Sequence, residues 1–170
     1  MLHCSSQEVS RRRRLAKNGL TIDLLTDGLP PCPTTKRKAA PPEIIDAERS
    51  AYRDKVRDPD PDWPPDVRAV YCTCRERLFE MGLEAQEVTD NLGIRNHNIY
   101  SRFRYFTGQR IKEWIIQHRL RLAKRFLRRT SLSGTWIAFA VGYESSSGFC
   151  TTFKRREGCT PTAFREREEE

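Results

Sequence analysis

The residues with the clearest chemical potential lie in a basic run between Arg95 and Arg129. This stretch contains eleven Lys or Arg side chains and a single acid, Glu113. A guanidinium group presents its N–H donors in a planar fork that fits phosphate oxygens. So one-sided a run favours an acidic partner, either nucleic acid or an acidic lipid, and the alternative is a solvated helix surface. The net charge of +8 over 170 residues agrees with the first interpretation.

The six cysteines, at positions 4, 32, 72, 74, 150 and 159, do not have the spacing of a metal site. Nowhere do two of them form a Cys-x-x-Cys pair, and side chains two residues apart on a helix face different directions. We therefore expect free thiols in a reducing cytoplasm, with no metal and no other cofactor.

Length and hydropathy exclude several classes of protein. A chain of 170 residues has room for one ordinary domain and a tail, or for two very small domains that share a core, and this excludes a large multidomain enzyme. No window approaches 18 consecutive apolar residues, so we expect no membrane span. The run of four arginines at 11–14 is not followed by an apolar signal core, and we expect no secretory signal.

One long predicted helix, residues 109–129, positions the basic run. Two apolar stripes follow its surface, and two stripes require two packing partners. The first stripe is Ile111, Ile115, Leu122 and Phe126, and the second is Ile116, Leu120, Ala123 and Leu127. At about 1.5 Å per residue this helix spans on the order of 30 Å, close to the ~34 Å turn of a DNA duplex.

Similar patterns flank the long helix on both sides. Residues 83–108 predict a short helix, a tight turn at Gly93, and a second helix that buries Ile99 and Phe103. This arrangement is typical of a helix-turn-helix unit, and the exposed face of its second helix is basic and rich in hydrogen-bonding groups.

The pattern returns over residues 131–158. Ser133 is the predicted N-cap of the first helix there, Gly142 makes the turn, and Phe149 and Phe153 are the buried pair of the second helix. The two turn glycines, at 93 and 142, are 49 residues apart. We interpret this as an internal repeat of two helix-turn-helix units.

Residues 1–65 have a different composition, since nine of the ten prolines lie between positions 30 and 65. Proline removes backbone donors, and few apolar residues are available to offset the entropy of ordering. We expect a largely disordered tail with a possible short, isolated helix at 43–57. An ordered domain is expected over 66–168, starting with a helix at 67–81 whose apolar side includes Val70, Leu78 and Met81.

Residues 67–168 resemble the DNA-binding domain of the AraC/XylS family of bacterial transcription regulators. The resemblance rests on LGIRNHNIYSRFRYFTG and on HRLRLAKRFLRRTSLSGTWIAFAVGYESSSGFCTTFKRREGCTPTAFR. It implies an all-α fold in which two helix-turn-helix subdomains, joined by the long helix, place their second helices in successive major-groove segments. It also implies a cytoplasmic, nucleoid-associated, sequence-specific regulator of transcription that is not an enzyme.

The resemblance implies partners and site residues as well. The expected partner is double-stranded DNA, with RNA polymerase or a partner regulator as further candidates. No ligand-sensing domain is visible, and the oligomeric state is not predicted. The base-contacting positions would be His97, Asn98, Tyr100 and Ser101 in the first unit, and Ser146, Ser147, Cys150 and Thr151 in the second. Phosphate contacts would come from Arg95, Arg102, Arg104, Lys154, Arg155 and Arg156.

The sequence departs from the family pattern at several of these positions. Many members carry Arg or another long donor where this chain has Ser101 and Thr151, and a bidentate contact of that kind contributes about 1–3 kcal/mol of discrimination. We expect weaker direct readout here, with more weight on phosphates and DNA shape. Trp136 stands where the family often has Glu, and Arg95 replaces the usual small N-cap.

Two other functions compete with this interpretation. One is an alkyl-transferring repair enzyme, which resembles the family in its DNA-binding part but needs clustered thiolates around zinc. The other is a helical partner-binding module whose basic face is incidental. It explains the charge but not the repeated glycine turn.

Overall fold

The computed structural model describes residues 42–95 and 98–169, and all regular structure in these ranges is helical. The predicted all-α fold is confirmed, while the predicted tail over 1–41 lies outside the described residues. The helices are α2 (Pro42–Arg53), α3 (Pro65–Glu76), α4 (Ala85–Asn91), α5 (Asn98–Thr107), α6 (Ile111–Arg129), α7 (Gly134–Ala140), α8 (Ser146–Glu157) and α9 (Pro161–Glu169).

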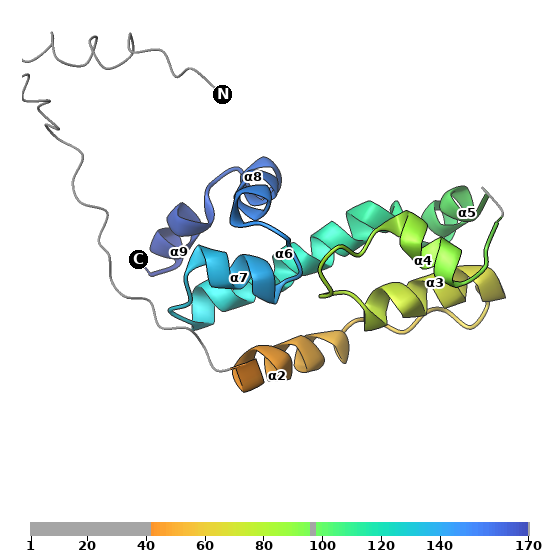
Figure 1. Ribbon diagram of the computed structural model, residues 1–170, viewed down its shortest axis with the longest axis horizontal. Coiled ribbons are helices and arrows are strands. Elements are labelled where there is room, and N and C mark those ends of the chain that lie inside the picture. Colours follow the sequence, from red (N-terminus) through yellow and green to blue (C-terminus); the bar gives the residue numbers. More distant parts are fainter. Residues whose placement is uncertain (1–41, 96–97, 170) are drawn as a thin grey trace, which may run out of the picture. The chain divides into compact units, whose positions relative to one another are not determined.

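Helix α6 lies between two groups of helices (Figure 1). Helices α3, α4 and α5 lie along its N-terminal half, and α7, α8 and α9 lie along its C-terminal half. Both predicted apolar stripes of α6 are buried, except that Ile116 is only partly covered. The two stripes therefore have the two packing partners that the sequence requires.

The pairs α4–α5 and α7–α8 are the two helix-turn-helix units. The second helix of each is anchored by two apolar residues four positions apart, as predicted, and the four residues are Ile99, Phe103, Phe149 and Phe153. In the first helix of the second unit, Ser133 is the predicted N-cap, and its Oγ accepts a hydrogen bond from the Trp136 backbone N–H at 3.3 Å. The Trp136 side chain is exposed on the surface of α7.

The turn glycines adopt the left-handed conformation that L side chains disfavour. Gly93 has φ +66° and Gly142 has φ +89°. A Cβ on Gly93 would meet no atom within 4 Å, whereas a Cβ on Gly142 would lie 2.9 Å from the backbone of Phe79. The second turn therefore needs glycine for close packing as well as for its backbone conformation.

The helix expected at 43–57 forms as α2, but the expectation that it is isolated is wrong. Ile45 and Tyr52 of α2, and Val56 beyond its end, are buried in the core. Arg49 also donates from Nε to the carbonyl oxygen of Ala140 at 2.7 Å. An amphipathic helix of 12 residues is only marginal by itself, and packing on a neighbour stabilises it.

The predicted end of the first helix of the domain and the predicted burial of Met81 need correction. The helix expected at 67–81 ends at Glu76, and Met81 is 62% exposed. After Glu76 the chain turns, and two carbonyl groups of residues 77–82 face α6. Leu78 and Glu80 supply these carbonyls, and both accept hydrogen bonds from the Arg119 side chain.

Arg119 is the central polar contact of the fold. Its side chain is only 7% exposed and lies in the middle of α6. Nε donates to the carbonyl of Leu78 at 2.9 Å, Nη2 to that of Glu80 at 2.6 Å, and Nη1 to that of Gly142 at 2.7 Å. The first two acceptors belong to the turn after α3, and the third belongs to the turn of the second helix-turn-helix unit. One guanidinium group therefore joins both halves of the domain.

A second buried arginine closes the C-terminal end of α6. Arg165 of α9 donates from Nε to the carbonyl of Leu127 at 3.1 Å and from Nη2 to that of Leu132 at 2.7 Å. A cation stabilises the last carbonyl groups of a helix. The ion pair between Arg128 and Glu168, at 2.7 Å, adds a surface contact between the same two helices.

Tyr52 and His118 connect α2 to α6. The Tyr52 hydroxyl lies 3.0 Å from His118 Nδ1, and the imidazole packs on Trp114 with ring centroids 4.2 Å apart. Burial lowers the pKa of His118 to about 4, and the positive charge of Arg121 adds to this effect. His118 is therefore neutral in the folded protein at pH 7.

We predict that Arg119→Met lowers the free energy of unfolding by on the order of 3 kcal/mol, because it leaves three carbonyl acceptors without a donor. Urea unfolding of the whole chain measures this change. The matched control is Arg129→Met, which replaces an exposed arginine of the same helix. Equal losses in the two variants would show that the Arg119 hydrogen bonds contribute little.

We also predict a pH dependence from His118. Its folded pKa of about 4 lies below the ordinary value of 6.5, so the unfolded chain binds the proton more readily. The corresponding stability is present above pH 6.5 and is lost as the pH falls toward 4. His118→Gln, which stays neutral, should flatten the slope of unfolding free energy between pH 7 and 4.5. An unchanged slope in that variant would contradict the assignment.

Candidate nucleic-acid interface

Helices α5 and α8 each present a polar face opposite their buried anchors. Ser101 on α5 is exposed, as are Ser147, Cys150 and Thr151 on α8, while Ser146 is partly buried. Asn98 begins α5 and is exposed, but His97 lies outside the described residues. Seven of the eight expected base-contacting residues are thus described, and all seven lie on the second helix of a helix-turn-helix unit.

Tyr100 differs from the other candidates because its hydroxyl is already bonded within the protein. Tyr100 Oη donates to Gln86 Oε1 at 2.9 Å and lies 3.2 Å from Thr89 Oγ1. Both partners belong to α4, and the Tyr100 side chain is partly buried. The residue therefore ties the two helices of the first unit together, a role that the sequence analysis missed.

The N-terminus of α8 is held by a serine cap. Ser145 Oγ accepts from the Gly148 backbone N–H at 3.2 Å, and the Ser147 hydroxyl lies 3.3 Å from the same oxygen. Such a cap satisfies a backbone donor that the helix itself leaves open. It also fixes the residue at which α8 begins.

The cations expected to contact phosphates divide into two groups. Five are exposed, and none of the five forms an ion pair within residues 42–95 and 98–169: Arg95, Arg104, Lys154, Arg155 and Arg156. Arg102 instead pairs with the carboxylate of Asp66 on α3. Its charge is therefore partly compensated, whereas the other five remain available to an anion.

A cavity of about 530 Å³ lies between the two units, with α6 as its floor. Gln86 and Tyr100 line it from the first unit, and Tyr143 and Arg155 from the second. Lys112 of α6 lies between them and is exposed, although the sequence analysis did not assign it to the site. Lys112 and Arg155 place positive charge at the junction of the two units.

Arg119 is the other residue that sequence reasoning missed, because it was counted with the basic run that was expected to face an acidic partner. A signal for its burial is present in the spacing. Arg119 lies four residues after Ile115 and three before Leu122, so it interrupts an apolar stripe of α6. A lone cation within an apolar stripe predicts a buried side chain with carbonyl or carboxylate partners.

Over 42–95 and 98–169 no group of three or more His, Cys, Asp or Glu side chains could hold a metal ion. The four cysteines in these ranges, Cys72, Cys74, Cys150 and Cys159, are free thiols. Among the described helices, none has the length and apolar character needed to cross a membrane.

Comparison with known proteins finds similar helix-turn-helix domains. A model of a helix-turn-helix domain matches residues 88–167. A putative AraC-like transcription regulator of Streptomyces lividans is 30% identical over 99 residues, which cover 58% of this chain and 33% of that protein. The bifunctional transcriptional activator/DNA repair enzyme AdaA of Bacillus subtilis is 29% identical over 108 residues, covering 64% of this chain and 49% of AdaA.

Solved structures support the same fold. The DNA-binding domain of AdpA, a global transcriptional factor solved in complex with a target DNA, superposes with a TM-score of 0.55 at 24% identity, covering 61% of this chain and 93% of that one. The matches to these and other curated relatives cover between 11% and 53% of the length of those proteins. Residues 88–167 therefore match a helix-turn-helix domain, and this part of the chain is similar to AraC-like transcription regulators and to solved DNA-binding domains of the same fold.

Proposed function

We propose that this chain is a sequence-specific DNA-binding regulator whose two recognition helices, α5 and α8, read successive major-groove segments on one face of a duplex. The observation that carries the proposal is the shared support of the two units. Each recognition helix follows a glycine turn, and Arg119 bonds to carbonyls from both halves of the domain. The 19 residues of α6 correspond to roughly 28 Å at about 1.5 Å each, comparable to one duplex turn of ~34 Å.

The contact residues follow from exposure and residue type. In the first unit, base contacts would come from His97, Asn98 and Ser101. Tyr100 would present its ring to the DNA, while its hydroxyl stays bonded to Gln86 of α4. In the second, they would come from Ser146, Ser147, Cys150 and Thr151. These are mostly short side chains that reach few base edges, so we propose that phosphate contacts and DNA shape supply much of the selectivity.

Phosphate contacts would come chiefly from the unpaired cations Arg95, Arg104, Lys154, Arg155 and Arg156. Most of them lie in the last turn of α5 or α8, so the duplex backbone would pass along the C-terminal ends of both recognition helices. Arg102 would first have to leave Asp66, and we assign it a weaker contribution.

We infer a non-catalytic role, although AdaA is also described as a DNA repair enzyme. Thiol chemistry requires a thiolate, and burial raises the pKa of Cys74 to about 12. Cys150 is exposed on the proposed DNA face, whereas the other described thiols lie on α3 and after α8. The arrangement supports DNA binding more than alkyl transfer.

Selection of binding sites from random duplex DNA, followed by footprinting of the selected site, tests this function. We expect two short preferred elements about one helical turn apart on one face of the duplex. Enrichment of only one element would contradict the two-headed proposal. Salt-sensitive binding with no enriched sequence would contradict specific readout.

We predict that the double variant Arg104→Gln/Arg155→Gln weakens binding to all duplexes and reduces the salt dependence of log K by about two counterions, roughly one for each phosphate that is no longer neutralised. The matched control is Arg129→Gln, an exposed arginine that lies on neither recognition helix. Fluorescence anisotropy at several salt concentrations measures the slope. A slope equal to that of the unmodified chain would show that neither residue neutralises a phosphate.

A further inference from the structure

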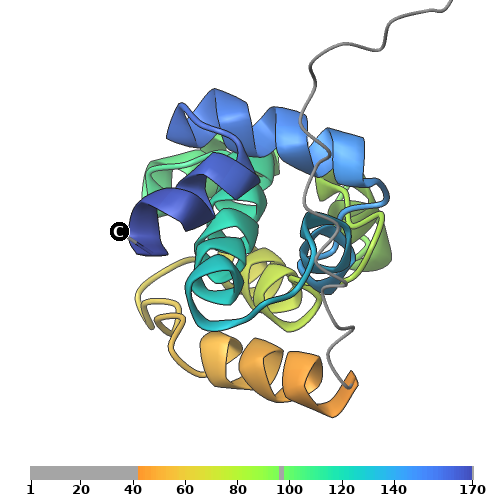
Figure 2. The ribbon, with the colours of Figure 1, turned by 90° about the vertical axis from the view of Figure 1, so that its left-hand side faces the viewer.

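A cavity of about 640 Å³ lies between α6 and the segment formed by α2 and the loop that follows it. Helix α2 lies on the side of α6 opposite α8 (Figure 2). The cavity is therefore separate from the exposed face of α8 that is proposed to contact DNA. Its size falls within the range of about 300–1,000 Å³ that is usual for small-molecule sites.

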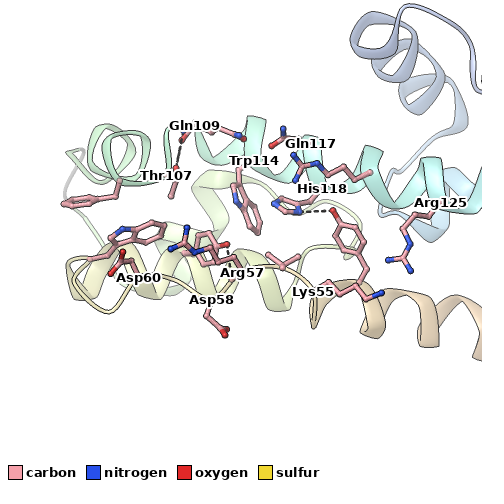
Figure 3. A pocket seen from close by; sticks show the side chains of 16 residues that line it. Lys55, Arg57, Asp58, Asp60, Thr107, Gln109, Trp114, Gln117, His118 and Arg125 are labelled. Carbon is pink, nitrogen blue, oxygen red and sulfur yellow. Dashed lines mark hydrogen bonds between the residues drawn. The ribbon is translucent and has the colours of Figure 1, made fainter.

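One wall of the cavity is a continuous band of aromatic rings (Figure 3). Trp63 and Tyr71 meet edge to face with ring centroids 5.5 Å apart, and Tyr71 and Trp114 do so at 5.0 Å. Phe106, at the end of α5, lies 6.4 Å from Trp63. These rings come from the loop after α2, from α3, from α5 and from α6, so the site requires the folded domain.

The charges around the cavity are mostly positive. Lys55, Arg57 and Arg121 line it, and none of them forms an ion pair with another described residue. Two acids also line the cavity. The carboxylate of Asp58 is paired with Arg75, and that of Asp60 accepts the Asp62 backbone N–H at 3.0 Å. The electrostatic interaction at this site is therefore more favourable for an anion than for a cation.

The inner end of the cavity carries a polar pair. Figure 3 shows His118 beside Trp114, with its ring bonded to a tyrosine of α2, Tyr52, at 3.0 Å. That bond uses Nδ1, and Nε2 has no hydrogen-bond partner among residues 42–95 and 98–169. Arg121 is close enough to both residues to influence their titration. The Arg121 guanidinium and His118 Nε2 thus lie in the same cavity as the flat aromatic rings of Trp63 and Trp114.

We propose that this cavity binds a small planar aromatic anion, with its ring against Trp63 and Trp114 and its negative charge toward Arg121. Aromatic walls with a few convergent polar groups favour a flat ligand of this kind. The proposal goes beyond DNA recognition and is tested on the chain without DNA. Ligand binding can therefore fail while the proposed DNA binding stands, and DNA binding can fail while ligand binding stands.

The indole N–H signals of the three tryptophans provide a direct test. Trp63 and Trp114 line the cavity, whereas Trp136 on α7 does not, so it serves as an internal control. In a titration of the tryptophan-labelled chain with 1-naphthoate, we expect saturable shifts of the Trp63 and Trp114 signals and a constant Trp136 signal. No saturable shift, or a Trp136 shift equal to the others, would overturn the proposal.

Matched ligands and variants separate specific binding from general attraction to a basic protein. We expect 1-naphthamide and 1-naphthylmethylammonium to bind at least tenfold more weakly than 1-naphthoate. Arg121→Gln should weaken naphthoate binding at least tenfold, and Arg57→Gln, a change in an exposed loop residue, should weaken it severalfold. Arg129→Gln, outside the cavity, should change nothing. Equal affinities for the three ligands, or an equal loss in Arg129→Gln, would contradict the site.

Discussion

The buried guanidinium of Arg119 is the interaction on which the rest of the domain depends. A charged group in an apolar core is costly unless hydrogen bonds satisfy it, and an arginine stays protonated in proteins. Arg119 meets this requirement with carbonyls from Leu78, Glu80 and Gly142. Because these acceptors come from the turn after α3 and from the second glycine turn, satisfying one charge fixes two distant turns against one helix. Gly142 must be glycine partly because those turns approach so closely.

This constraint connects the fold to the proposed function. The aromatic anchors Phe103, Phe149 and Phe153 are fully buried, so the polar faces of α5 and α8 are left on the surface. In the first unit, the Tyr100 hydroxyl on α5 bonds to Gln86 of α4 and holds the two helices together, and in the second unit Ser145 caps the start of α8. In the proposed function, the cations that remain exposed and unpaired on these helices would supply an electrostatic attraction to DNA that does not depend on sequence.

Sequence patterns predicted the architecture well, because it follows from apolar spacing and glycine turns. The long helix, the two units and the pairs Ile99–Phe103 and Phe149–Phe153 are all recognisable in this way. What the sequence did not reveal depends on contacts between distant segments. Helix α2 was expected to be isolated because proline-rich flanks hide its role, yet its apolar side packs into the core. Arg119 and Arg102 were both read as surface charges, since composition does not distinguish a guanidinium bonded to carbonyls, or paired with Asp66, from a solvated one.

The central claim is that the two recognition helices act as one rigid reader, and the spacing of the selected DNA elements tests it most directly. Duplexes carrying both elements would be compared with duplexes in which about 5 base pairs, roughly half a helical turn, are inserted between them. If α6 and Arg119 hold the helices at a fixed separation, the insertion should reduce the affinity at least tenfold, to that of a duplex with a single element. An affinity unchanged by the insertion would show that the two units bind independently, and would contradict this account.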